Sequence, residues 1–118
     1  MIERLFCSFA PDVASVFAPY PSRFAENYVC WRTGCPGKKG GGTVVHSRPP
    51  GEDADQVEEI QGSGFGCLLL RSGVVKKHFF QVPGNHKYYD PHFFDSMPRD
   101  WKRLVDWSCI CEHRNAVV

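Results

Sequence analysis

Long apolar runs and an excess of charge of one sign are both missing from this sequence. No stretch approaches the roughly 18 apolar residues that a membrane span needs. The first residues, MIERLFCSFAPD, hold too short an apolar run for a signal peptide. The formal net charge is +1, so overall charge gives no argument for binding to polyanions. We therefore expect a cytosolic protein.

Internal repeats and long linkers are missing too. The chain has 118 residues, which is enough for one hydrophobic core but not for two. We therefore interpret residues 1–118 as a single domain. Residues 1–26 form an N-terminal extension of uncertain structure, in which residues 12–18 could form a short helix between prolines.

Short apolar segments between Gly/Pro-rich turns predict β-strands in the middle of the chain. NYVCWRT (27–33) and GTVVH (42–46) flank a Gly-rich turn and are typical of a hairpin. GCLLLRSGVVKKHFFQV (66–82) predicts a second hairpin with its turn at Ser72-Gly73.

The remaining segments are assigned by composition and by period. Residues 51–64 are acidic and poor in apolar side chains, which indicates an exposed loop. Residues 87–90 could add a short strand. Residues 99–107 carry apolar side chains at helical spacing, with a proline suited to the first turn, and predict a helix. The expected fold class is α+β: a small antiparallel sheet with helices.

The six cysteines are free thiols, metal ligands or a nucleophile if the compartment is reducing. Cys30-x4-Cys35 and Cys109-x-Cys111-x-His113 could supply the ligands of a tetrahedral zinc. Neither half has the C-x2-C spacing of common zinc knuckles. A zinc-stabilised interaction module is one interpretation, and simple burial of small apolar thiols is another.

A nucleophilic cysteine is the third interpretation. If Cys111 begins a helix, the helix dipole would favour its thiolate. His46 ends a predicted strand and is one partner that the fold could bring to the thiol. The other candidates are His78, His86 and His92.

The C-terminal residues CEHRN (111–115) resemble the NCEHF box of the LRAT-like, or H-box/NC, family. GGGTVVHSRPPGED (40–53) is similar to the GDGYVVHLAPPSE segment of that family, and residues 73–90 to the segment that follows it. NYVCWRTG (27–34) occupies the place of the H-box, HWAIYVG. The helix expected over residues 99–107 stands where the family has the helix before its Cys box.

The resemblance implies a permuted papain-like (NlpC/LRAT-like) fold. In the family, a cysteine attacks an ester, the H-box histidine is its base, and a second histidine orients that base. By position, Cys111 matches the nucleophile and His46 the second histidine, whereas Cys30 or Tyr28 replaces the base. A neutral thiol or phenol is a poor proton acceptor. The motif thus implies a degenerate site without acyltransferase or protease activity; an active thiol acyltransferase or phospholipase A using Cys111 is the alternative.

The same domain occurs as the non-structural 2A protein of some picornaviruses, including kobuvirus-like members. The small size, the lack of a membrane anchor and the degenerate motif are similar to that group. The resemblance implies a role in viral RNA replication or encapsidation in the host cytoplasm, through host proteins or viral RNA and without a cofactor. The basic residues that would make these contacts are Lys38, Lys39, Lys76, Lys77, Arg99, Lys102 and Arg103.

Overall fold

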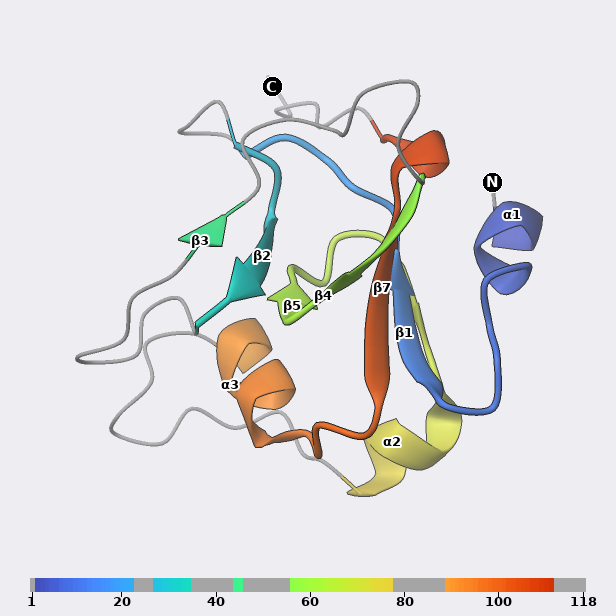
Figure 1. The fold of residues 1–118 in the computed structure, drawn as a ribbon, viewed down its shortest axis with the longest axis vertical. Helices are drawn as coiled ribbons and strands as arrows, with labels where there is room; N and C mark the ends of the chain where they lie inside the picture. The colour runs from blue at the N-terminus through green and yellow to red at the C-terminus, as the bar shows by residue number, and fades with distance from the viewer. Residues whose placement is uncertain (1, 23–26, 35–43, 46–55, 78–88, 112–118) are drawn as a thin grey trace, which may run out of the picture.

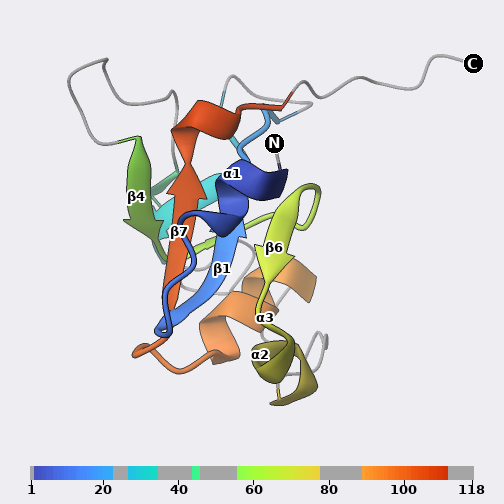
Figure 2. The same ribbon diagram turned by 90° about the vertical axis from the view of Figure 1, so that its right-hand side faces the viewer.

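In the computed structural model, two strands that are far apart in the chain lie side by side at the centre of the larger sheet. β1 (Val13–Phe17) and β7 (Lys102–Asp106) pair in parallel. β4 (Val57–Ile60) pairs antiparallel with β7, and β6 (Leu68–Leu70) pairs antiparallel with β1. The order of this mixed sheet is β4-β7-β1-β6 (Figure 1, with β6 labelled in Figure 2). The structure describes residues 2–22, 27–34, 44–45, 56–77 and 89–111.

A smaller antiparallel sheet lies against one face of the larger sheet (Figure 1). Its central strand β2 (Cys30–Thr33) pairs with β3 (Val44–Val45) and with β5 (Gly62–Ser63). The hairpin that we predicted on either side of the Gly-rich turn is therefore confirmed. β5 follows β4 after Gln61, whose backbone N–H donates to the carbonyl of Trp31 (3.0 Å). This short connection carries the chain from one sheet into the other.

Short helices complete the fold, which confirms the predicted α+β class. α1 (Ile2–Phe6) covers the second face of the larger sheet, and α3 (Tyr89–Ser96) lies on the same face as the smaller sheet (Figure 2). α2 (Ser72–Lys77) follows β6, and the 3-10 helix η1 (Trp107–Cys109) follows β7. Within the described ranges, no helix has the length and apolar character to span a membrane.

The larger sheet divides the hydrophobic core into an α1 side and an α3 side. Leu5 of α1 packs with residues of β1 on the first side, and the aromatic residues of α3 pack with residues of β1 and β2 on the second. Because side chains alternate across a strand, neighbouring residues join different sides. The residues on the α1 side include Val16, Leu69 and Leu104, and those on the α3 side include Phe17, Leu68 and Val105.

The two helices predicted at the ends of the chain are wrong, because both segments contain strands. Residues 102–106 form β7 after a turn in which Trp101 N–H donates to the Pro98 carbonyl (3.2 Å). Residues 13–17 form β1, all five of them buried. Each of these strands has a neighbour on both edges, so the ladder satisfies its backbone donors and acceptors on both sides. Leu5 and residues 13–18 of the N-terminal segment thus contribute to the core.

Four further expectations need correction. The sheet is mixed rather than antiparallel, because β1 and β7 run parallel. The described part of residues 66–82 ends at Lys77 and supplies one strand and then α2, in which Val75 N–H donates to the Arg71 carbonyl (3.3 Å). Residues 73–77, expected to begin the second strand, are therefore helical, and residues 78–82 lie outside the described part. Residues 51–64 are not a loop throughout, since they contain β4 and β5. Tyr89 and Asp90, expected in a strand, begin α3, and residues 87–88 lie outside the described part.

Candidate functional site

Cys111, the predicted nucleophile, lies just after η1 on the α1 side of the larger sheet. Its backbone N–H donates to the Pro19 carbonyl (2.7 Å) and its side chain packs against the cluster around Leu5. Burial and a hydrogen bond with the Cys67 side chain raise the pKa of the Cys111 thiol to about 11. The thiol is therefore protonated at neutral pH. The helix expected from Cys111 onward falls on residues 112–118, outside the described part.

η1 is held in place by the residue before it. Asp106 is buried, and its Oδ1 accepts a hydrogen bond from the backbone N–H of Ser108 (3.0 Å). Cys109 ends η1 and is buried in the same cluster as Leu5, and burial raises the pKa of its thiol. The sequence Cys109-x-Cys111 thus supplies two protonated thiols that fill space between η1, α1 and β1.

Cys30, a predicted replacement for the base, is buried on the other side of the larger sheet. It packs with Phe17, Ile60 and Val105. Burial, and after it the negative charge of Glu58, raises the pKa of Cys30 to about 12. A thiol with this pKa accepts no proton from a nucleophile at neutral pH.

The other predicted partners of Cys111 are distributed as follows. The ring of Tyr28 packs edge-on against Trp107, with 5.2 Å between ring centroids. His92 lies in α3, on the face of the sheet opposite Cys111. The other three histidines of this set lie outside the described residues: His46, His78 and His86.

The larger sheet therefore separates Cys30 from Cys109 and Cys111. The described residues contain no group of three or more His, Cys, Asp or Glu side chains arranged to hold a metal ion. Cys35 and His113, the other predicted zinc ligands, lie outside these residues. The three described cysteines of the predicted zinc set cannot share one ion in this arrangement.

The raised pKa of Cys30 predicts a loss of stability at alkaline pH. The folded state keeps this proton up to pH about 12, whereas the unfolded chain releases it near the ordinary value of 9.0. The contribution is thus complete below pH 9 and is lost as the pH rises toward 12. We expect the free energy of unfolding to fall by about 1 kcal/mol between pH 8 and 10 from this group. In Cys30→Ala, the free energy of unfolding measured by urea titration should not show this part of the fall. An identical pH dependence in the wild-type chain and in Cys30→Ala would contradict the prediction.

The described members of the predicted basic set do not form one surface. Lys102 pairs with Asp12 (3.1 Å), with both side chains about half exposed. Its neighbour Arg103 points to the opposite face and is only 4% exposed. Lys76 and Lys77 are exposed at the end of α2, and Arg99 is exposed in the turn before β7. Lys38 and Lys39 lie outside the described residues.

Arg99 and Arg103 line a cavity together with Arg32, an arginine that was not predicted from the sequence. A surface cavity of about 370 Å³ lies between the edge of β4, the start of β7 and β2. It is lined by Arg32, Glu59, Ile60, Gln61, Arg99 and Arg103. Arg32 lies two residues after Cys30 in β2 and carries no local sequence signal for such a site.

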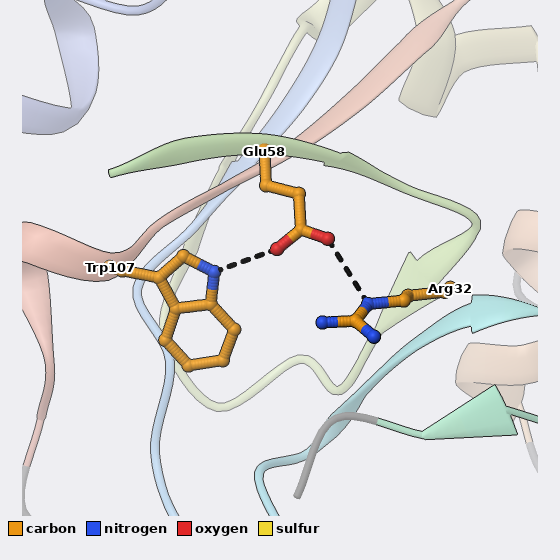
Figure 3. Close-up of polar contacts among 3 residues, drawn as sticks. All are labelled: Arg32, Glu58 and Trp107. Atoms are coloured by element: carbon orange, nitrogen blue, oxygen red, sulfur yellow. Dashed lines mark hydrogen bonds and ion pairs between the residues drawn. The ribbon is translucent and has the colours of Figure 1, made fainter. Parts of the chain in front are cut away.

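The side chain of Arg32 is positioned by a carboxylate that also holds a tryptophan (Figure 3). Its Nε donates to Glu58 Oε2 (3.2 Å), and Trp107 Nε1 donates to Glu58 Oε1 (3.1 Å). Glu58 thus connects β2 of the smaller sheet to η1. This connection fixes Arg32 at the wall of the cavity.

A second cavity, of about 330 Å³, lies between α1 and β6 and is lined in part by Phe6, Phe9 and Arg71. Here the Arg71 guanidinium is used for packing. Its Nε and Nη2 donate to the Val13 and Ala10 carbonyls (2.8 and 2.6 Å), and it lies over the Phe9 ring (5.7 Å to the centroid). Arg71 therefore ties the N-terminal segment to β6.

No family model matches the chain, and comparisons with curated proteins and with solved structures also found no match.

Proposed function

We propose that the chain is a non-enzymatic protein that contacts RNA, with a role similar to that of the picornaviral 2A proteins of the H-box/NC type. The observation that carries the non-enzymatic part is the separation of Cys111 from Cys30 by the larger sheet. In the family that the motifs resemble, the nucleophile and the base must meet. In this chain the two positions face different sides of the core.

The permuted papain-like arrangement of that family belongs to the same proposal. The β2–β3 hairpin at the position of the H-box supports it. The strand β7 at the position of the expected helix counts against it. The proposal for RNA rests on the resemblance and on the exposed cations of the predicted set, of which Lys76, Lys77, Arg99 and Lys102 are described.

Binding of a 20-nucleotide single-stranded RNA at several salt concentrations tests the proposal. If about three cations contact phosphates, log K should fall with log salt with a slope of about −2, which is an affinity loss of about 20-fold between 50 and 200 mM salt. The measurement is fluorescence anisotropy of labelled RNA with the full chain. An absence of binding at 50 mM salt would rule the proposal out.

The alternative, a thiol acyltransferase or phospholipase A that uses Cys111, makes an opposite prediction for the thiol. A long-chain acyl probe would label Cys111 at neutral pH, and Cys111→Ala would lose the label. On our proposal the wild-type chain and Cys111→Ala give the same low signal.

A further inference from the structure

The cavity lined by Arg32, Arg99 and Arg103 brings together three guanidinium groups from separate parts of the chain. Its volume, about 370 Å³, falls within the roughly 300–1,000 Å³ range of small-ligand sites. The lining holds one carboxylate, that of Glu59. Arginine is the side chain best suited to recognise a phosphate group, because its planar fork donates two parallel hydrogen bonds.

Arg103 is the most constrained of the three. It is 4% exposed, and its Nη2 donates to the carbonyls of Phe94 (3.0 Å) and Met97 (2.9 Å) at the end of α3. Its Nε is buried, and no described residue accepts a hydrogen bond from it. Buried polar groups are nearly always paired, and a buried charge is costly without a counter-charge. None of the described carboxylates forms an ion pair with Arg103.

Burial is the main cause of the lowered pKa of Arg103. After burial, the positive charge of Arg99 lowers this pKa further, whereas the carboxylates of Glu59, Asp100 and Asp95 act in the opposite direction. The Arg99 side chain is exposed and has no hydrogen-bond or ion-pair partner among the described residues. An oxyanion between Arg99 and Arg103 would reduce the repulsion between them.

From these contacts we infer that the cavity is a binding site for a phosphate group, and that the phosphate belongs to an RNA chain. Arg99 and Arg32 supply donors at the rim, and Arg103 supplies positive charge in the wall. The choice of RNA as the source rests on the function proposed above; the recognition of phosphate rests on the cavity. The competing explanation is that Arg103 only caps the C-terminal end of α3.

Arg99→Ala is the informative variant, because the side chain is exposed and its removal should leave the fold intact, as checked by circular dichroism. Arg4→Ala is the matched control, since it removes one exposed arginine of α1, on the other face of the larger sheet, whose Nε donates to Ser108 Oγ (3.1 Å). We expect Arg99→Ala to weaken binding of an eight-nucleotide single-stranded RNA about tenfold, as is typical for a charged hydrogen bond. We expect Arg4→Ala to change the RNA affinity less than twofold, and Arg99→Lys to weaken it by an amount between those of the two alanine variants.

Thermal unfolding with inorganic phosphate separates the two proposals. At equal ionic strength, phosphate should raise the melting temperature of the wild-type chain more than chloride does, and this difference should disappear in Arg99→Ala.

If the wild-type chain binds RNA and Arg99→Ala binds it equally well, the cavity inference is overturned while the proposed function stands. If phosphate stabilises the wild-type chain and Arg99→Ala equally, or stabilises neither of them, the cavity is not a phosphate site. If phosphate acts as expected but RNA does not bind, RNA is excluded as its source.

Discussion

Replacing Phe17 with alanine is expected to lower the free energy of unfolding by about 3–5 kcal/mol. Phe17 is fully buried on the central strand β1 and packs with Cys30, Ile60 and Val105. Its ring lies edge-on to Tyr20, with 5.5 Å between centroids. Truncation removes the transfer energy of the ring and leaves a cavity between the two sheets. Because small domains are stable by only about 5–15 kcal/mol, this one change removes a large fraction of the total.

Urea denaturation followed by circular dichroism measures the effect. Phe6→Ala is the control, because the Phe6 side chain is 61% exposed on α1 and its loss should cost less than about 0.5 kcal/mol. If Phe17→Ala does not fold, Phe17→Leu should fold and lose about 1–2 kcal/mol. Equal stabilities for Phe17→Ala and Phe6→Ala would show that β1 is not at the centre of the core.

Alkylation of Cys111 at neutral pH is expected to be at least about tenfold slower than that of an ordinary thiol. Its pKa of about 11, against an ordinary 9.0, leaves about 100-fold less thiolate at pH 7. The greater nucleophilicity of a more basic thiolate recovers part of this loss. The rate should rise about tenfold per pH unit and level off only near pH 11, since deprotonation limits it below that value.

Iodoacetamide labelling followed by mass spectrometry of the digest gives the rate at each cysteine. Cys7 is exposed at the end of α1 and serves as the internal reference in the same sample. Cys67→Ala should speed the reaction of Cys111, because the Cys67 side chain contributes to the raised pKa. Faster labelling of Cys111 than of Cys7 at pH 7 would instead indicate an activated nucleophile and would favour the acyltransferase.

The hairpin of β2 and β3 was predictable because its signals are local. A Gly-rich turn lies between two short runs of β-branched and aromatic residues, which fit a half-buried pleated surface. Strand β1 has no such signal. All five of its residues are buried, so it lacks the alternation of polar and apolar side chains that marks a strand with one exposed face. Its short apolar run between prolines fits a helix equally well.

β7 shows the limit of periodicity more directly. Trp101, Leu104 and Val105 have helical spacing, yet Leu104 and Val105 pack on opposite faces of the larger sheet. What decides between helix and strand is the partner strand β1, which lies far away in the sequence. In α2 a strand was predicted and a helix is found. Val74 and Val75 favour a strand by propensity, but the chain turns at Arg71 and only Val74 is fully buried.

The candidate site was predicted less well than the fold. Cys111 and Cys30 were predicted from a sequence motif, but a motif does not report which face of a sheet each residue occupies. Arg99 and Arg103 were selected as surface charges on one helix. Their actual positions, at a turn and inside a strand, depend on β7, and Arg32 joins them only because the two sheets pack together.

The parallel pairing of β1 with β7 has a consequence for synthesis of the chain. About 85 residues separate the two strands, and a ribosome adds roughly 5–20 residues per second. β1 therefore emerges about 4–17 s before the strand that covers one of its two edges. During that interval the backbone donors and acceptors on the edge of β1 that faces β7 have no partner strand, because β6 pairs with the other edge. The exposed segment is almost entirely apolar. A nascent chain of this protein should thus bind chaperones through residues 13–17 until β7 arrives, and release them once it does.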